Sequence, residues 1–160
     1  SGRVIGVDMT PEMIEKAKAN AKRGGFTNVE FRQGVMEELP VEKETVDIVI
    51  SNCVINLSQS KQQVFNELYR VLKHGGQIAI ADIVALGPLP PDLLEDEEAF
   101  SACLSGAAEV KDIKQMLRNA GFQDLEIQMI DEHWSESQSC CDDGHANLPL
   151  ASAAIMARKA

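Results

Sequence analysis

This 160-residue sequence lacks long hydrophobic runs and an excess of positive charge. No apolar stretch approaches the roughly 20 residues that span a bilayer, and no signal peptide opens the chain, so we expect no membrane partner. Acidic residues number 25 against 15 basic ones, and the net charge of −10 disfavours binding to nucleic acid or anionic lipid. An ordinary apolar content of 44% predicts a single globular domain over residues 1–160.

Cysteine is also sparse, with four residues in the chain: Cys53, Cys103, Cys140 and Cys141. Their spacing fits neither a dense disulfide scaffold nor a structural zinc site. We therefore expect reduced thiols and a cytoplasmic location. The adjacent pair at 140–141 is interpreted as part of an exposed polar loop, with a second soft-ligand site as the alternative.

What the sequence does contain is a regular alternation of strand and helix patterns. Strands are predicted at 3–8, 29–33, 46–53, 77–84, 125–129 and 151–158. Helices are predicted from Thr10 to Gly24, from Ser60 to His74 and over 113–120, with a short acidic helical insertion near 88–108. This order predicts an open, doubly wound, mostly parallel α/β sheet whose last strand is antiparallel.

The strand beginning at Val46 carries the most informative signal. Its β-branched run does not alternate with polar residues, which predicts a strand buried on both faces. It ends in Asn52 and Cys53, and ligands of such sheets bind beyond the carboxyl ends of the strands. A thiol is therefore expected where chemistry takes place, although a lone cysteine is more often a small buried hydrophobe.

The strand ending at Asp8 suggests a nucleoside site. An acid in that place accepts hydrogen bonds from ribose hydroxyls in dinucleotide-type folds, or else only complements the dipole of the following helix. Val35, Met36 and Glu37 follow the next strand and could enclose an adenine, with an ordinary packed loop as the alternative. Asn52 could offer its amide to a ligand or only cap its loop.

The glycine-rich loop that normally accompanies such an acid is not in the chain. We therefore expect the fold to lack its first strand and helix. The strands that end at Asp8 and Cys53 should then have unpaired edges or pair with each other, and self-association through these edges is one consequence.

Four segments together make the sequence similar to a known family. They are residues 7–10 with Met13, residues 51–57 (the most specific match), residues 69–76 and residues 102–107. On these segments the sequence resembles the class I S-adenosylmethionine-dependent methyltransferases, and within them the arsenite methyltransferases.

The resemblance implies a role for each candidate residue. Asp8 would bind the ribose of S-adenosylmethionine and Met9 would pack on its sugar or adenine, while Val35, Met36 and Glu37 would line the adenine pocket and Asn52 would lie near the cofactor. Cys53 and Cys103 would bind trivalent arsenic as thiolates. The substrate would then be arsenite or its thiol conjugate.

Three functions remain open from the sequence. The first is transfer of a methyl group from S-adenosylmethionine to arsenic held by cysteine thiolates. The second is methylation of a small organic substrate, in which Cys53 is only a packing residue. The third is a non-catalytic arsenic-binding fragment without a cofactor site.

Overall fold

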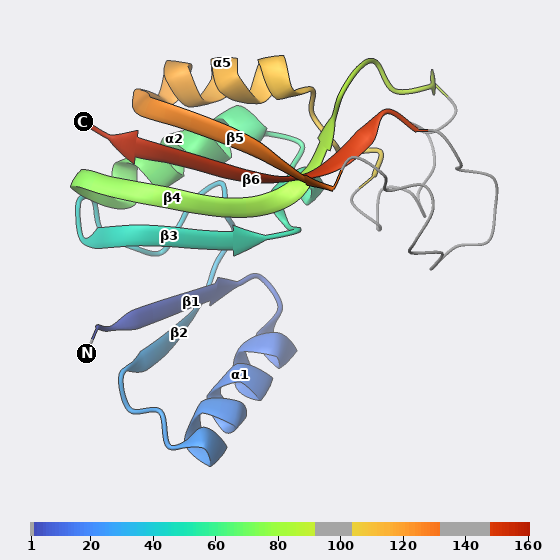
Figure 1. Cartoon of the computed structure of the whole chain (residues 1–160). Coiled ribbons are helices and arrows are strands. Elements are labelled where there is room, and N and C mark those ends of the chain that lie inside the picture. Colours follow the sequence, from blue (N-terminus) through green and yellow to red (C-terminus); the bar gives the residue numbers. More distant parts are fainter. Residues whose placement is uncertain (1, 92–103, 132–147) are drawn as a thin grey trace.

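The computed structural model describes residues 2–91, 104–131 and 148–160. The described chain forms two groups of elements (Figure 1). The first contains a two-stranded sheet with one helix, and the second a four-stranded sheet with two helices. The acidic helical insertion predicted near 88–108 falls largely outside the described residues. That residues 1–160 form a single domain stays a prediction.

The first group is a β-α-β unit. Strand β1 (Val4–Asp8) leads through helix α1 (Pro11–Gly24) to strand β2 (Val29–Gln33), which pairs with β1 in parallel. Proline suits the first helical position because its missing N–H has no partner there anyway. The helix ends at Gly25, whose φ of 70° is a left-handed conformation that glycine adopts without steric cost.

The second group has the strand order β3-β4-β6-β5. Strand β3 (Val46–Asn52) is followed by a short 3-10 helix η1 (Ile55–Leu57), helix α2 (Lys61–Val71) and strand β4 (Leu72–Ala85), which is parallel to β3. Helix α5 (Val110–Ala120), strand β5 (Phe122–Asp131) and strand β6 (Leu150–Lys159) complete it. Strand β6 is antiparallel to both neighbours, as the sequence predicted.

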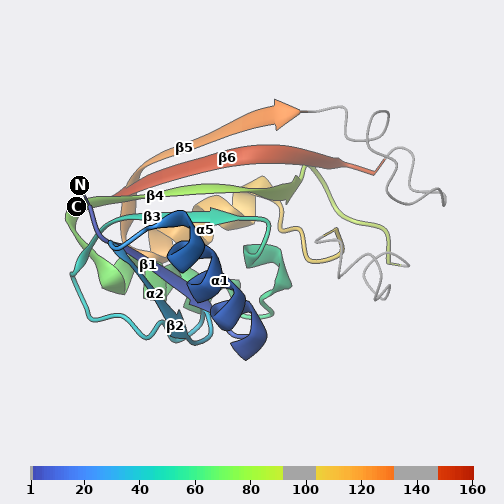
Figure 2. The same cartoon turned by 90° about the horizontal axis from the view of Figure 1, so that it is seen from below.

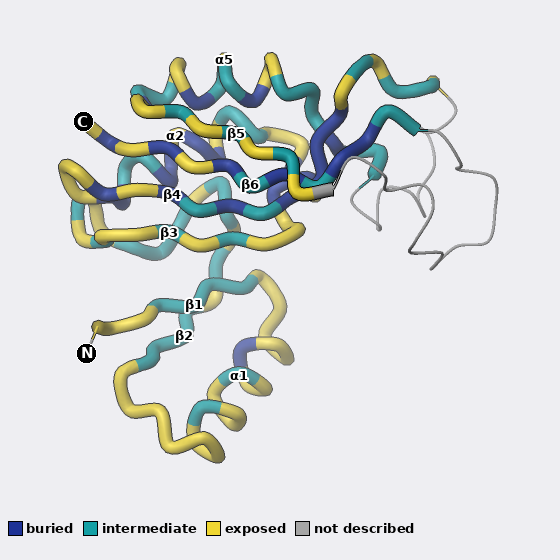
Figure 3. The backbone as a smooth tube through the Cα atoms, viewed as in Figure 1, coloured by how far each residue is buried: buried dark blue, intermediate teal, exposed yellow. Residues whose placement is uncertain are grey.

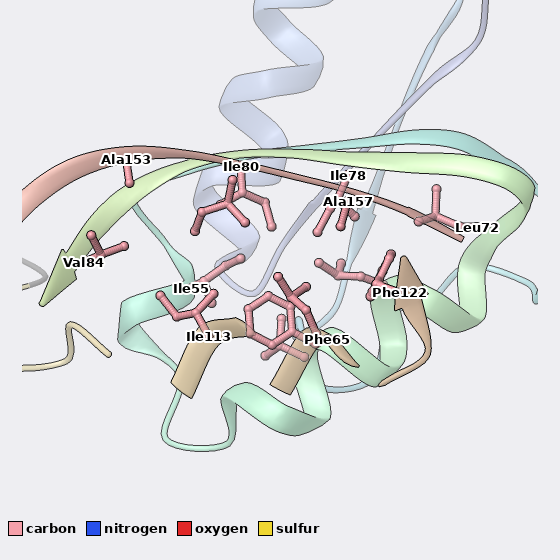
Figure 4. Close-up of a cluster of buried hydrophobic side chains, with 14 of the residues drawn as sticks. Ile55, Phe65, Leu72, Ile78, Ile80, Val84, Ile113, Phe122, Ala153 and Ala157 are labelled. Carbon is pink, nitrogen blue, oxygen red and sulfur yellow. The ribbon is translucent and has the colours of Figure 1, made fainter. Parts of the chain in front are cut away.

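The main core lies between this sheet and helices α2 and α5, which cover the same face of it (Figure 2). Phe65 of α2 and Leu117 of α5 are 2% and 0% exposed, and they face Ile78 and Ile80 of β4. Figure 4 shows Phe65 surrounded by aliphatic side chains from η1, α5 and the sheet. Burial of this apolar area is the main stabilising contribution.

The opposite face of β3 is exposed, so the prediction of burial on both faces is wrong for this strand (Figure 3). Ile48 and Ile50 are 45% and 76% exposed, whereas Val49 between them packs against the core. Alternate side chains of a strand point to opposite faces. Among the described elements, helices cover only the face to which Val49 points.

The edges of the two sheets also stay apart. Within the described ranges, β1 pairs only with β2, and β3 pairs only with β4. This agrees with the expectation that the strands ending at Asp8 and Cys53 have unpaired edges. The open, Rossmann-like α/β class predicted from the sequence is confirmed.

Helix α2 ends at Val71, three residues earlier than predicted, and β4 begins at Leu72. The buried ammonium of Lys159 explains the early end, because it donates to the carbonyl oxygens of Tyr69 at 2.9 Å and Leu72 at 2.8 Å. These carbonyls at the end of α2 are thereby satisfied by a residue far away in the sequence.

Candidate active site

The carboxyl ends of β1 and β2 form the first part of the site. Asp8 lies opposite Gln33, and the N–H of Gly34 donates to the carbonyl oxygen of Asp8 at 3.0 Å. The side chain of Asp8 accepts the backbone N–H of Thr10 at 2.8 Å, which fixes the carboxylate at the start of α1. The side chain of Thr10 makes no capping hydrogen bond of its own.

Exposed apolar side chains follow the ends of both strands. Met9 is 68% exposed and Val35 is 42% exposed, and Gln33 connects the two strand ends by donating from Nε2 to the carbonyl oxygen of Met9 at 3.3 Å. Exposed apolar groups beside a fixed acid suit a nucleoside, which offers a flat base and ribose hydroxyls. The residues here therefore fit the adenosyl part of S-adenosylmethionine. Met36 is partly buried and packs against the main core.

Glu37 connects this first part to the turn after β3. The hydroxyl of Ser58 donates to the carboxylate of Glu37, and Nε2 of Gln63 donates to the Glu37 carbonyl oxygen at 3.3 Å. Ser60, at the start of α2, makes no side-chain capping hydrogen bond. Glu37 is accordingly held by contacts between the two groups of elements.

A partly buried ion pair supports the same loop, and sequence reasoning missed it. Glu67 of α2 is 8% exposed and accepts the N–H of Leu39 at 2.9 Å, while Arg70 donates to Glu67 from Nε and Nη2, both at 2.7 Å. Arg70 also donates to the Leu39 carbonyl oxygen at 3.0 Å. The hydrogen bond from Arg70 is the main reason that the pKa of Glu67 is lowered. An acid on the apolar face of a helix, three residues before an arginine, was the available signal.

Cys53 lies directly beyond β3. Its N–H donates to the carbonyl oxygen of Ala81 at 2.9 Å, and its φ of 52° turns the chain away from the sheet. A positive φ in a residue other than glycine is uncommon, so surrounding contacts must maintain it. The residue is exposed, and desolvation together with the negative charge of Asp82 raises the pKa of its thiol.

Asp82 and Asn56 form buried hydrogen bonds next to this turn. Neither residue was selected as a site residue from the sequence. Asp82 is 4% exposed and accepts the N–H of Ile55 at 3.1 Å and Nδ2 of Asn56 at 2.9 Å. Asn56 is 3% exposed and also donates to the carbonyl oxygen of Ile83 at 2.7 Å. Burial is the main reason that the pKa of Asp82 is raised. An acid within the apolar run of β4 was the overlooked signal.

The segment around Gly106 packs against the same turn. A Cβ on Gly106 would overlap the carbonyl oxygen of Asn56 and lie 3.0 Å from its carbonyl carbon, so the two backbones pack closely. Cys103, Cys140 and Cys141 lie outside the described residues, and the structure does not test whether Cys103 meets Cys53.

The candidate residues thus form two clusters at strand ends that point the same way (Figure 1). Asp8, Met9 and Val35 belong to the β1–β2 sheet, whereas Asn52 and Cys53 belong to the β3–β4 pair. Glu37 links the two clusters through Ser58. No helix in the described ranges is both long and apolar enough to cross a membrane.

Comparison with known proteins agrees with this arrangement. Residues 1–121 match the model of a family described as a methyltransferase domain. The chain belongs to this methyltransferase family. The resemblance predicted from the sequence, to S-adenosylmethionine-dependent methyltransferases and arsenite methyltransferases in particular, is confirmed by individual relatives.

The chain is 48% identical to an arsenite methyltransferase of Halobacterium salinarum, over 99% of its own length and 40% of that protein. It is 42% identical to the arsenite methyltransferase of Mus musculus, over 76% of its length and 35% of that protein. The crystal structure of an arsenic(III) S-adenosylmethionine methyltransferase from Chlamydomonas reinhardtii superposes with a TM-score of 0.79 at 33% identity, covering 99% of this chain and 56% of that one. The chain therefore spans about two fifths of the length of the first of these curated relatives.

Proposed function

We propose that this chain is the methyl-transferring domain of an arsenite methyltransferase. It would transfer a methyl group from S-adenosylmethionine to trivalent arsenic held by the thiolates of Cys53 and Cys103. The observation that carries the proposal is an exposed thiol on a fixed turn at the end of β3, together with a fixed carboxylate at the end of β1, a strand that points the same way. The similarity to arsenite methyltransferases supports the choice of substrate.

The residues of this chain would bind and orient the two reactants. Asp8 would accept hydrogen bonds from the ribose hydroxyls, Met9, Val35 and Met36 would contact the adenosyl group, and Glu37 would accept from the adenine amino group. Asn52 would lie near the cofactor. When bound, S-adenosylmethionine would supply an electrophilic methyl group.

Arsenite would bind by exchange of its hydroxyl groups for sulfur. Each thiol that binds releases one water molecule, because the thiol proton leaves with the arsenic-bound hydroxyl. The arsenic lone pair would then form a bond to the methyl carbon while the bond from that carbon to the sulfonium sulfur breaks and leaves its electron pair on sulfur. Holding the two centres in line is the main task of the protein.

Cys103 is supported as the second thiol by the contact between Gly106 and Asn56. Gly106 follows Cys103 by three positions, and a chain of that length spans at most about 10 Å. Asn56 follows Cys53 by the same interval, and Gly106 packs directly against its backbone. This contact brings the two segments into the same region of the molecule, and we propose that both thiols reach one arsenic atom.

The test is arsenite titration by calorimetry under reducing conditions. Cys53→Ser and Cys103→Ser should each abolish or strongly weaken binding, while Cys141→Ser, from the predicted exposed loop, serves as the matched control. Unchanged affinity in both site variants would refute the proposal and favour methylation of a small organic substrate. A parallel titration with S-adenosylmethionine that gives no heat would favour a non-catalytic arsenic-binding fragment.

We also propose that the chain self-associates through the open edges of β1 and β3, because an unpaired strand edge is a template for pairing. The exposed Ile48 and Ile50 on β3 support this proposal. Sedimentation velocity over a range of concentrations tests it, and a monomer at all concentrations would contradict it. A cytoplasmic location and the absence of a nucleic-acid partner stay predictions.

A further inference from the structure

The most constrained polar groups near Cys53 are Asp82 and Asn56, which have no part in the chemistry described above. Both side chains are almost completely buried, at 4% and 3% exposure. Burying a carboxylate is unfavourable unless hydrogen bonds replace its lost hydration. The structural question is therefore which groups supply those hydrogen bonds.

Three hydrogen bonds to the Asp82 carboxylate come from the chain on either side. Its Oδ2 accepts the N–H of Ile55 at 3.1 Å, and its Oδ1 accepts Nδ2 of Asn56 at 2.9 Å and the N–H of Ile83 at 2.9 Å. Two of these donors belong to η1, the element that begins two residues after Cys53. The carboxylate therefore ties the end of β4 to the turn that carries the thiol.

Asn56 extends the connection in two directions. Its amide donates to the carbonyl oxygen of Ile83 at 2.7 Å, and its own carbonyl oxygen accepts Nζ of Lys61 at 3.3 Å. The backbone at Gly106 packs against the same carbonyl. The start of α2, the end of β4 and the segment at Gly106 thus all converge on one residue of the turn.

We propose that Asp82 is a positioning residue that, through Ile55 and Asn56, holds the turn at Cys53 in its left-handed conformation and so sets where the thiol meets arsenic. This inference rests on the proposed function. Asp82 acts on the backbone of the turn and does not itself bind arsenic. The positive φ of Cys53, 52°, is the strained conformation that such contacts must maintain.

The test compares Asp82→Asn and Asn56→Ala with a matched control, Asp47→Asn. Asp47 forms an exposed ion pair with Lys73 at the other end of the same two strands, so the control removes the same charge far from the turn. Calorimetry would measure the affinities of the full chain for arsenite and for S-adenosylmethionine, well below the melting temperature of each variant. Circular dichroism would first establish that each variant is folded.

We expect both site variants to weaken arsenite binding roughly fivefold or more while the S-adenosylmethionine affinity changes less than about twofold. The control should match the wild type for both ligands. A general loss of stability would reduce both affinities together or neither, so the selective loss distinguishes positioning from a merely structural role. If Asp82→Asn does not fold, Asn56→Ala, which retains the carboxylate, decides the question.

Wild-type arsenite affinity in folded Asp82→Asn and Asn56→Ala, or equal losses for both ligands, would overturn the inference while leaving the proposed function intact. Arsenite binding that survives Cys53→Ser would instead overturn the proposed function and this inference with it. The two failures are therefore distinguishable in the same set of titrations.

Discussion

Replacing Gly106 with alanine tests the close contact beneath the Cys53 turn. The added Cβ would overlap the carbonyl oxygen of Asn56 and would lie 3.5 Å from its Cβ. The nearest obstacle is backbone, which cannot rotate away as a flexible side chain could. Overpacking of this kind destabilises a protein by about 1–3 kcal/mol. In a chain of this size that corresponds to a fall in melting temperature of roughly 2–10 °C.

The matched control is Gly87→Ala, in which an added Cβ meets nothing within 4 Å. It should be neutral or stabilise by less than about 1 kcal/mol, because alanine reduces the freedom of the unfolded chain. Urea unfolding of both variants, followed by circular dichroism, gives the two changes in free energy of unfolding. Equal stability of the two variants would refute the packing argument, and with it the close approach of the 104–108 segment to the turn.

Three further changes test other contacts. Desolvation and, to a smaller extent, the charge of Asp82 raise the pKa of the Cys53 thiol. Asp82→Asn should therefore move the midpoint of the pH profile for iodoacetamide alkylation of Cys53 to lower pH. An unmoved midpoint would contradict that charge effect. Arg70→Ala should destabilise the protein by about 1 kcal/mol at pH 7 and by less at pH 3. The reason is that the lowered pKa of Glu67 contributes stability that is lost as the pH falls. If urea unfolding gives the same difference in free energy between variant and wild type at both pH values, this reasoning is wrong. Lys159→Met should cost about 1–3 kcal/mol because the carbonyl oxygens of Tyr69 and Leu72 lose their donor and Glu44 loses its partner, and an unchanged urea midpoint would argue against that role.

The local parts of the fold could be predicted from the sequence. The bounds of β2 coincide with the predicted 29–33, and β1 and α1 each begin one residue later than predicted and end at the predicted residue. Proline at the start of α1 and glycine at its end act over a few positions, so they can be recognised without knowledge of the tertiary structure.

The early end of α2 and the exposed face of β3 could not be predicted in this way. Helix α2 ends where Lys159, from the last strand, donates to its final carbonyls. The exposure of Ile50 depends on which face of the sheet the helices cover, and an apolar run carries no information about that. Both features depend on contacts between distant segments.

In the candidate site, too, local features could be predicted from the sequence, whereas contacts between distant segments could not. Asp8 and Cys53 were recognisable because each stands at the end of a strand pattern. Asp82 and Asn56 were not selected, since their partners come from segments more than 20 positions apart in the sequence. Each of them departs from the apolar pattern around it, and such departures are often found at functional sites.

The placement of a carboxylate near the thiol disfavours ionisation of the thiol. Desolvation and the charge of Asp82 both raise the pKa of Cys53 and so reduce its thiolate fraction. A cysteine that must act as a nucleophile on its own normally has the opposite environment. In the proposed reaction, however, a protonated thiol can replace an arsenic-bound hydroxyl with release of water, so the equilibrium does not require a preformed thiolate. A buried acid can therefore be retained next to Cys53 for the hydrogen bonds that it provides to the turn.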